Sequence, residues 1–304
     1  MSKALVTGAG GFVGNYLVKE LQAHGRDVLC VTNSGIPANS NEEWRVIDII
    51  HKDALSKYVK NARPEEIYHL AAISRPVGFG VHDYFNTNVI GTLNLLECAK
   101  EVGANILVVS SAYAYGNYSE KIDEGFPLKP VNPYGASKAA QDILASSYSY
   151  SDNRVVCVRP FNHIGPDQSA GFLVPDIISK IRKHYSTDNK SPTIEMGDMS
   201  PVRDFLDVRD VVRAYRIIMD ETVPPESYNV CSGTGYSVKE IFELCCAGLS
   251  IEARFKESEQ LKRDAEIQSL VGRADKLQSV CSWRPQLDIK KCIADIISSS
   301  DEHS

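Results

Sequence analysis

Short, nearly all-apolar runs recur along the first half of the chain, and segments with helical spacing separate them. Seven runs have the length of β-strands: 3–7, 27–32, 44–48, 66–70, 106–110, 154–158 and, much later, 228–231. Between them, residues 15–21, 88–102 and 135–148 repeat apolar side chains three and four positions apart, which is typical of amphipathic helices. Apolar strands that alternate with helices predict an α/β fold, with a parallel sheet covered by helices on both faces.

The regular alternation ends near Pro160, which indicates a second structural unit. Prolines and glycines then interrupt the chain, at Pro166, Gly171, Pro175, Pro192 and Gly197. We therefore expect a first lobe formed by residues 1–160 together with about 207–231. A second, smaller C-terminal lobe is expected from about 161–206 and 232–304.

A glycine-rich turn joins the first strand to the first helix. Gly8, Gly11 and Gly14 have the spacing G-x-x-G-x-x-G. The first glycine permits a tight turn, the second lets the backbone approach a pyrophosphate, and the third lets the helix pack on the strand. The N-terminus of the helix offers free N–H groups to phosphate. The first lobe is thus predicted to be a doubly wound, Rossmann-type dinucleotide-binding domain.

The sequence leaves the choice between NAD and NADP open. An acidic residue after the second strand would bind the ribose 2′-hydroxyl, and a basic one would bind a 2′-phosphate. Residues 32–34 are Thr-Asn-Ser, which are neither. Asp48, after the third strand, is suitably placed for an adenine edge, although it could equally be a solvated surface residue.

The composition excludes several other classes of protein. The 304 residues carry a net charge of −6, which argues against a general nucleic-acid binder. No apolar run approaches the roughly 20 residues of a membrane span, and no signal peptide is evident, so we expect a cytoplasmic protein. The eight cysteines show no C-x-x-C pair. They are expected to be free thiols, and we expect no metal site.

Tyr134 and Lys138 are the strongest candidates for chemistry. They are four residues apart in a predicted helix, so their side chains share one face. An ammonium beside a phenol favours the phenolate, which predicts a lowered pKa for Tyr134. Ser111 ends a predicted strand and could hold a substrate oxygen against the phenol. These three residues suit proton transfer to and from a carbonyl or carbinol oxygen.

In combination, the motifs resemble the extended short-chain dehydrogenase/reductase family, and more closely its nucleotide-sugar branch. The resemblance covers almost the whole chain. It rests on the glycine turn, His69-Leu70-Ala71-Ala72, Asn88-Val89-x-Gly91-Thr92, Ser110-Ser111, Tyr115-Gly116, Tyr134-x-x-x-Lys138, Arg159-Pro160-Phe161-Asn162 with Gly165-Pro166, and Arg203-Asp204-Phe205-x-x-Val208-x-Asp210. Residues 159–166 and 228–233 look particularly like GDP-6-deoxy-4-keto-D-mannose reductases, which form GDP-D-rhamnose.

The resemblance implies roles for individual residues. Tyr134 would be the catalytic acid, Lys138 would lower its pKa and hold the nicotinamide ribose, and Ser111 would bind the reacting oxygen. The cofactor, NADP or NAD, would be bound by Gly8, Gly11, Phe12, Val13, Gly14, Asn33, Asp48, Ile49, Leu70, Ala71, Ala72, Asn88, Tyr134 and Lys138. The sugar nucleotide would be bound by Ser74, Ser111, Ala112, Tyr113, Asn162, Val174, Arg203 and Arg263. At Arg263 the match is incomplete, because Asp264 replaces the proline usual in the family.

One departure from the family's pattern narrows the reaction. Sugar-nucleotide 4,6-dehydratases usually carry an acidic residue directly after the catalytic serine or threonine, whereas Ala112 and Tyr113 follow Ser111 here. Without a carboxylate to assist loss of water, dehydration is disfavoured. The leading hypothesis is reduction of the C4 keto group of a nucleoside-diphosphate 6-deoxy-4-ketohexose. The alternatives are an NAD-dependent 4-epimerase, a 4,6-dehydratase and a non-catalytic sensor of dinucleotides.

Structural roles compete with functional ones at some positions. His163 is better explained as a packed residue than as a functional one. Arg203 could pair with Asp204, but we favour it as a phosphate ligand, because its guanidinium binds phosphate in a bidentate manner.

The helices expected at 88–102 and 135–148 carry more apolar side chains than one stripe facing the sheet would need. The additional ones include Leu93, Leu96, Ile143 and Leu144. The resemblance implies that these two helices form the four-helix interface of a homodimer.

Overall fold

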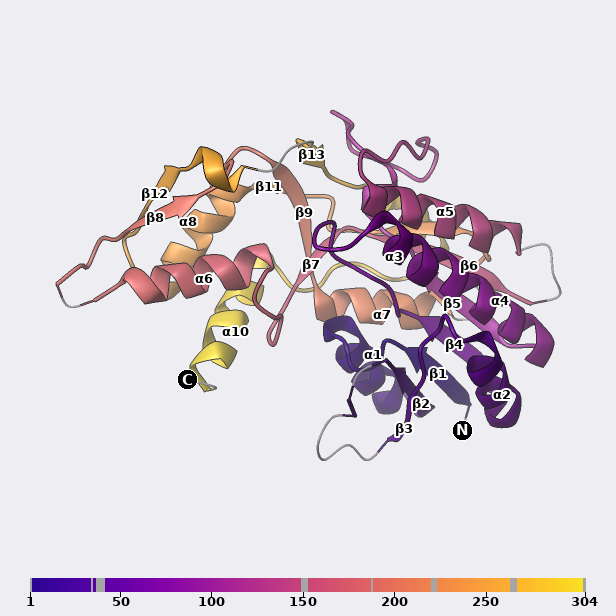
Figure 1. The fold of residues 1–304 in the computed structure, drawn as a ribbon. Helices are drawn as coiled ribbons and strands as arrows, with labels where there is room; N and C mark the ends of the chain where they lie inside the picture. The colour runs from indigo at the N-terminus through magenta and orange to yellow at the C-terminus, as the bar shows by residue number, and fades with distance from the viewer. Residues whose placement is uncertain are drawn as a thin grey trace.

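The computed structural model describes residues 2–33, 35–36, 42–148, 153–186, 188–219, 223–262 and 267–302. Within these residues it has two lobes side by side, with the chain ends in different lobes (Figure 1). No helix among the described residues combines the length and apolar character needed to cross a bilayer.

The first lobe is built on a seven-stranded sheet in the order β10-β6-β5-β4-β1-β2-β3, and every neighbouring pair is parallel. Its strands are β1 (Lys3–Thr7), β2 (Asp27–Thr32), β3 (Glu43–Val46), β4 (Glu66–His69), β5 (Asn105–Val109), β6 (Val155–Pro160) and β10 (Ser227–Val230). The sheet is the predicted Rossmann-type sheet, and the strand ends differ from the expected ones by at most two residues. The chain therefore has the expected α/β class.

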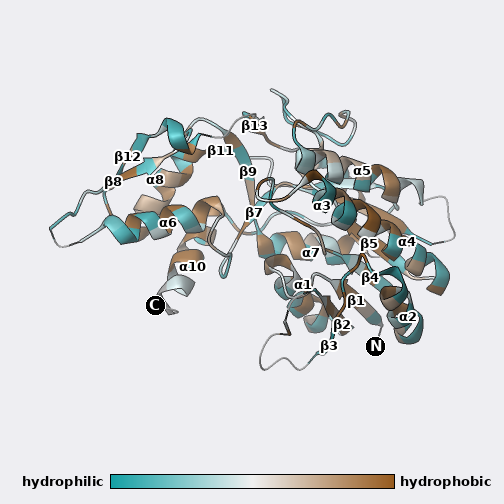
Figure 2. Ribbon diagram, in the orientation of Figure 1, coloured by the Kyte–Doolittle hydropathy of each residue, from teal (hydrophilic) through white to brown (hydrophobic). Residues whose placement is uncertain are grey.

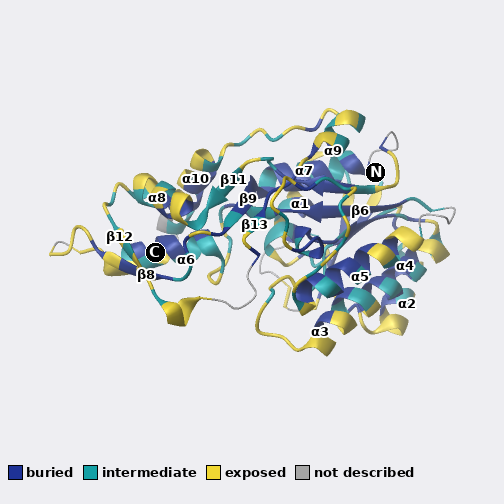
Figure 3. Ribbon diagram, turned by 90° about the horizontal axis from the view of Figure 1, so that it is seen from above, coloured by how far each residue is buried: buried dark blue, intermediate teal, exposed yellow. Residues whose placement is uncertain are grey.

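Helices cover both faces of this sheet, which explains why its strands are apolar on both sides (Figures 1 and 2). The helices of one face are α2 (Lys52–Ala62), α4 (Gly91–Val102) and α5 (Pro133–Ser147); those of the other are α1 (Phe12–Ala23) and α7 (Val208–Ile218). The strands between the two layers are largely buried (Figure 3), except the edge strand β3, where only Trp44 is buried. The central strands and helices thereby form a rigid base for the loops at the strand ends.

The helix expected from residue 88 begins earlier than the sequence pattern indicates. A continuous helical segment consists of α3 (Val81–Phe85), the π-helix η1 (Asn86–Ile90) and α4. Gly103, with a φ of 77°, ends α4 in the left-handed conformation that glycine adopts without strain. Single π-turns inside helices often occur at functional sites, and this one carries Asn88.

The second lobe contains short strands that the sequence pattern did not predict. These are β7 (Asn162–Ile164), β8 (Thr193–Met196), β9 (Val202–Asp207), β11 (Gly235–Ser237), β12 (Arg254–Glu257) and β13 (Ser269–Leu270). Helices α6 (Leu173–His184), α8 (Val238–Leu249) and α10 (Ile289–Glu302) pack with them around a separate apolar core. The remaining short elements are η2 (Ala112–Ala114), η3 (Glu259–Leu261) and α9 (Asp275–Val280).

One segment expected in the second lobe packs with the first. Leu277 of α9 and Trp283 are fully buried in the core of the large sheet, and the Trp283 indole donates a hydrogen bond of 3.0 Å to the Asp210 carbonyl. The other boundaries of the two lobes stay a prediction.

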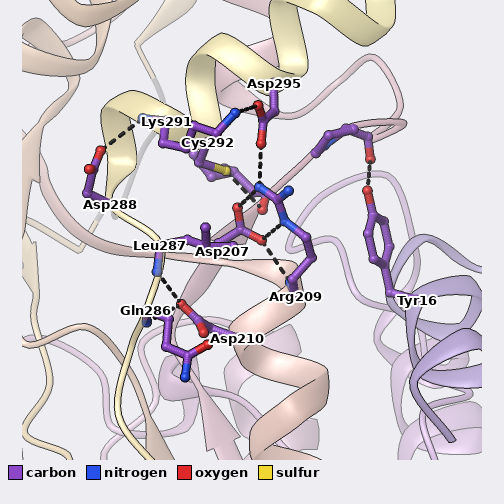
Figure 4. Close-up of polar contacts among 12 residues, drawn as sticks. Tyr16, Asp207, Arg209, Asp210, Gln286, Leu287, Asp288, Lys291, Cys292 and Asp295 are labelled. Carbon is purple, nitrogen blue, oxygen red and sulfur yellow. Dashed lines mark hydrogen bonds and ion pairs between the residues drawn. The ribbon is translucent and has the colours of Figure 1, made fainter. Parts of the chain in front are cut away.

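Ion pairs and hydrogen bonds join the lobes where α7 begins (Figure 4). The Arg209 guanidinium lies between Asp207 and Asp295, at 2.7 Å from a carboxylate oxygen of each. Asp210 accepts hydrogen bonds from the backbone N–H groups of Gln286 and Leu287. α10 and the segment before it are thereby fixed to the end of β9 and the first turn of α7.

Candidate active site

The predicted site residues gather at the carboxyl ends of the parallel strands. The glycine turn follows β1, Leu70 to Ala72 follow β4, Ser110 and Ser111 follow β5, and Phe161 and Asn162 follow β6. In open parallel sheets, ligands bind in the crevice at this edge, where the strand order reverses. The order here reverses between β1 and β4.

The glycine turn has no room for side chains. Gly8 has a φ of +71°, and a Cβ there would lie 2.8 Å from the Ala71 nitrogen. A Cβ on Gly14 would lie 2.2 Å from the Gly8 carbonyl oxygen, so α1 could not approach the strand as closely. α1 begins at Phe12, directly after Gly11, and its N-terminal N–H groups point toward this turn. A bare backbone cradle at a helix N-terminus fits a dinucleotide pyrophosphate.

Tyr134 lies in the first turn of α5. The helix starts at Pro133, and the Asn132 side chain accepts a 2.8 Å hydrogen bond from the Gly135 N–H, which caps the helix. The Tyr134 ring lies between two other tyrosines, with ring centroids 5.6 Å from Tyr113 and 5.9 Å from Tyr84. The Ser111 side chain lies near enough to the phenol to influence its pKa, so both hydroxyls could reach one substrate oxygen.

The electrostatics of Tyr134 differ from the prediction. Burial raises its pKa well above the ordinary value, and the nearby Ser111 hydroxyl opposes this only in part. The expectation that Lys138 lowers this pKa was wrong for the structure as it stands. The physical reason is that a dry environment destabilises the phenolate.

Lys138 is buried and directed toward β5. Its Nζ donates hydrogen bonds of 2.9 Å to the Val109 carbonyl and 2.9 Å to Gln141 Oε1. Burial lowers the pKa of Lys138 to about 7, while Cys157 and Asp142 act in the opposite direction. Lys138 is therefore a group whose charge changes near neutral pH.

Asn88 joins the loop after β4 to the catalytic helix. Its amide accepts a 2.8 Å hydrogen bond from the Ile73 N–H and donates one of 2.9 Å to Ser137 Oγ. The Ser137 hydroxyl in turn donates to the Tyr134 carbonyl at 2.7 Å. Asn88 is fully buried, so in this structure it holds two parts of the site together.

The other predicted cofactor residues lie around the same edge, with different degrees of exposure. Asn33 is exposed at the end of β2. The Asp48 carboxylate accepts a 3.1 Å hydrogen bond from the Ile50 N–H and so stabilises its own turn. The Ile49 side chain is buried against α4, which leaves its backbone as the part that could contact a cofactor. Phe12 stacks on His163, with ring centroids 6.4 Å apart.

His163 makes the contacts of a packed residue. Its Nδ1 lies 3.1 Å from the Phe161 carbonyl oxygen, and burial lowers the pKa of its imidazole. These contacts agree with the structural role expected for it.

The predicted substrate residues of the second lobe lie on neighbouring strands. β7 pairs with β9, so that Asn162 lies opposite Phe205, two residues along the strand from Arg203. The Asp204 carboxylate accepts hydrogen bonds from the N–H groups of Ser232, Gly233 and Gly272, and successive side chains of a strand point to opposite faces. Asp204 thus anchors two loops and leaves Arg203 on the other face.

Not every predicted substrate residue has an accessible side chain. Val174 has no exposed surface and packs in the core of the second lobe, so only its backbone could contact a ligand. Ala112 is also buried. Ser74 precedes Arg75, whose guanidinium donates a 3.1 Å hydrogen bond to the Ala170 carbonyl of the opposite lobe. Arg263 lies outside the described residues.

Sequence reasoning missed several polar side chains behind the site. Thr7 and Gln141 were not considered, and His69 and Thr92 were noted only as parts of motifs. Gln141 follows Lys138 by three residues and so lies on the same helix face, which was a signal available in the sequence.

None of the cysteines is a predicted site residue, although Cys157 influences the pKa of Lys138. All eight are free, and six of them are buried, as expected for scattered thiols. Among the described residues, no cluster of histidine, cysteine and carboxylate side chains could hold a metal ion.

A family model described as GDP-mannose 4,6-dehydratase matches residues 5–296 of this chain. The chain belongs to this family. The match covers both lobes, including the glycine turn, Ser111, Tyr134 and Lys138. Membership makes the protein an extended short-chain dehydrogenase/reductase, as the sequence motifs suggested.

Two curated relatives are each 30% identical to this chain. One is a GDP-6-deoxy-D-mannose reductase of Pseudomonas aeruginosa, with 97% of this chain and 96% of the relative aligned. The other is a GDP-6-deoxy-D-talose 4-dehydrogenase of Aggregatibacter actinomycetemcomitans, with 91% and 90% aligned.

Solved structures resemble it over the full length. RMD from Pseudomonas aeruginosa, complexed with NADPH, has a TM-score of 0.84, 29% identity and complete coverage of both chains. MoeE5, in complex with UDP-glucuronic acid and NAD, has a TM-score of 0.88, 25% identity and the same coverage. This member of the dehydratase family is thus an NAD(P)-dependent, nucleotide-sugar-modifying enzyme of the oxidoreductase type.

Proposed function

We propose that this enzyme reduces the C4 keto group of a nucleoside-diphosphate 6-deoxy-4-ketohexose, and that the substrate is GDP-6-deoxy-4-keto-D-mannose and the product GDP-D-rhamnose. The observation that carries the proposal is the environment of Tyr134. A buried, protonated phenol beside Ser111 packs against Tyr84 and Tyr113, and an alanine follows the serine where a dehydratase has an acid. The GDP-linked substrate is supported by the P. aeruginosa reductase, which is similar over nearly the whole chain.

The raised pKa of Tyr134 suits the reducing direction. The phenol stays protonated at neutral pH, so it can donate a proton to the alkoxide that forms at C4. Oxidation of a carbinol, the first half of an epimerase cycle, would instead need the phenolate, which the dry site disfavours. A nicotinamide supplies the hydride when it is bound.

The remaining residues hold and polarise the substrate. The Ser111 hydroxyl can donate a hydrogen bond to the carbonyl oxygen beside the phenol. The Lys138 ammonium adds positive charge near the developing alkoxide, and preorganised charge of this kind often supplies the largest part of a rate enhancement. Arg203 and Asn162, on the neighbouring strands β9 and β7, would bind the diphosphate from the second lobe.

A 4-epimerase remains the closest alternative, because the same three residues would serve it. The two activities differ in their use of the cofactor. A reductase consumes one NAD(P)H for each sugar, whereas an epimerase regenerates its cofactor within each cycle. A 4,6-dehydratase likewise shows no net consumption, and it produces a 4-keto sugar instead of removing one.

The test supplies the purified enzyme with GDP-6-deoxy-4-keto-D-mannose and either NADPH or NADH. We expect absorbance at 340 nm to fall in proportion to the keto sugar consumed, and NMR to identify a GDP-6-deoxyhexose with a C4 hydroxyl. Interconversion of C4 epimers of a sugar nucleotide without net loss of NAD(P)H would establish the epimerase instead. Absence of turnover across GDP-, UDP- and dTDP-linked sugars would favour a binding protein.

A further inference from the structure

A chain of buried polar side chains runs behind the active site, from the strand before the glycine turn to the catalytic helix. His69 Nδ1 lies 2.8 Å from Thr7 Oγ1, and His69 Nε2 lies 2.8 Å from Thr92 Oγ1. Gln141 Nε2 donates to Thr92 Oγ1 at 2.8 Å, and Gln141 Oε1 accepts from Lys138 Nζ at 2.9 Å. All five side chains are buried, and four separate elements, β1, β4, α4 and α5, contribute them.

The hydrogen bonds of this chain fix the direction of each donor. The Thr92 hydroxyl donates its one proton to the Asn88 carbonyl, at 2.7 Å. It must therefore accept from both His69 and Gln141, which places the imidazole proton on Nε2. His69 Nδ1 then accepts from the Thr7 hydroxyl, and Thr7 Oγ1 accepts from the Ala71 N–H at 3.2 Å.

These constraints leave Gln141 with a single orientation. Its NH₂ group faces Thr92, so its carbonyl oxygen must face Lys138. A flipped amide would place two donors against the Lys138 amine and lose the donation to Thr92. Gln141 Oε1 and the Val109 carbonyl together hold the Lys138 nitrogen at two points.

The charges around Lys138 are consistent with this arrangement. Burial, together with the nearby charge of Lys138, lowers the pKa of His69 to about 3, so the imidazole is neutral. Asp142, one residue after Gln141, is paired with Arg159 at 2.8 Å, and Cys157 lies on β6. Tyr134 is the titratable group one helical turn before Lys138. Gln141 thus offers Lys138 a neutral hydrogen-bond acceptor, whereas the carboxylate of Asp142 is paired with Arg159.

We propose that Gln141, oriented by Thr92 and the neutral His69, is a positioning residue that fixes the Lys138 nitrogen against the Val109 carbonyl for its part in the reaction. Gln141 acts through Lys138 and touches no reacting atom. The catalytic part of this inference rests on the proposed function, because it assumes that Lys138 assists reduction at C4. The structural part, that Gln141 holds the Lys138 nitrogen in place, can be tested in the protein without any ligand.

The test compares variants by the titration of Lys138 in the cofactor-free protein. NMR of protein labelled with ¹³Cε-lysine reports the charge of each lysine, and the loss of one signal in Lys138→Met assigns that residue. In Gln141→Glu, the added carboxylate should move the midpoint of the Lys138 titration (the Lys138 midpoint) to higher pH. In Gln141→Met, which has a similar shape but no oxygen acceptor, the ammonium loses a partner and the midpoint should move to lower pH.

A second pair of variants tests the orientation of Gln141 from its other end. Thr92→Val removes the hydroxyl and should shift the Lys138 midpoint downward, as Gln141→Met does. Thr92→Ser keeps the hydroxyl and should restore the wild-type midpoint. Asn153→Ala is the matched control, because it removes hydrogen bonds of 2.7 Å and 3.1 Å to the Ala99 and Ala104 carbonyls at the opposite edge of the sheet. It should lower stability and leave the Lys138 midpoint unchanged.

Steady-state kinetics provide the second readout. We expect kcat to fall by about 10²-fold in Gln141→Met with little change in the KM of the sugar nucleotide, because misplaced catalytic groups cost rate and not binding. Unchanged Lys138 midpoints in all the Gln141 and Thr92 variants, with only a loss of stability like that of Asn153→Ala, would overturn the proposal. If no C4 reduction is found, the titration still decides whether Gln141 positions Lys138, so the two failures can be told apart.

Discussion

The Tyr113 ring meets the Tyr134 ring edge-on, with centroids 5.6 Å apart and planes inclined at 65°. This contact explains two properties of the site. Tyr113 contributes to the burial of the Tyr134 phenol, and it stands close in sequence to the position where a dehydratase has its acid. The site is thereby equipped to protonate an oxygen and has no carboxylate next to Ser111 to assist the loss of water.

Replacing Tyr134 by phenylalanine keeps the ring packing with Tyr84 and Tyr113 and removes the transferable proton. We expect kcat to fall by about 10²–10⁴-fold, the usual contribution of a general acid. Cofactor affinity, measured by quenching of NADPH fluorescence, should stay within a few-fold of the wild type. Turnover close to that of the wild type would show that another group donates the proton.

The pKa of about 7 for Lys138 predicts a pH dependence for kcat/KM. Because burial lowers this pKa, the ammonium is present below pH 7 and is lost as the pH rises through that value. The charge that stabilises the alkoxide is lost with it. We therefore expect kcat/KM to decline on the alkaline side of neutrality, whereas the protonated Tyr134 persists to higher pH. A profile that stays flat to pH 10 would contradict this role of Lys138.

Arg203→Ala tests the binding of the nucleotide diphosphate. The loss of a charged hydrogen bond should weaken the binding of the sugar nucleotide by about 1.5–3 kcal/mol and leave the affinity for the nicotinamide cofactor unchanged. Calorimetry on the Ala variant and on Arg203→Lys, which keeps a positive charge without the planar fork, measures this effect. Unchanged substrate affinity with a lowered Tm would instead make Arg203 a structural residue, held through its 2.9 Å hydrogen bond to the Val202 carbonyl.

We propose that the enzyme forms a homodimer through α4 and α5. Ile143 of α5 is 63% exposed, and Ile90 and Phe85 near the start of α4 are also exposed. Leu96 of α4, which we expected at the dimer interface, is buried with 1% exposure and cannot contribute to that interface. Light scattering should give about twice the 33.5 kDa chain mass. Ile143→Glu should shift the mass toward the monomer; a wild-type monomer would refute the proposal.

The sequence predicted the large sheet well because its strands are apolar on both faces and glycine or polar residues end them. Asn105–Val109 and Val155–Pro160 differ from the predicted strands by one or two residues at an end. β7 and β13 were not predicted, because strands of two or three residues are defined by their pairing with β9 and not by a local pattern.

The site was predicted in outline, since the spacing of Tyr134 and Lys138 places both on one face of α5. The sequence could not show that the Lys138 side chain turns toward the Val109 carbonyl, or that burial raises the pKa of Tyr134. Both depend on residues far apart in the sequence, Val109 of β5 for Lys138 and Tyr84 of α3 and Tyr113 of η2 for Tyr134, which only the tertiary structure brings together. The same holds for Val174, whose burial depends on the packing of α6 in the second lobe.

The most direct test of C4 reduction uses NADPH that carries deuterium at C4 of the nicotinamide. Two preparations are needed, each with the deuterium on a different face of the nicotinamide ring. With GDP-6-deoxy-4-keto-D-mannose as substrate, mass spectrometry and NMR of the product report where the label goes. We expect one of the two labelled cofactors to give one deuterium for each product molecule, located at C4 of the sugar, with an equal amount of NADP formed. A product without deuterium at C4 from either cofactor, or a product formed without loss of NADPH, would contradict the assignment of this enzyme as a 4-ketoreductase.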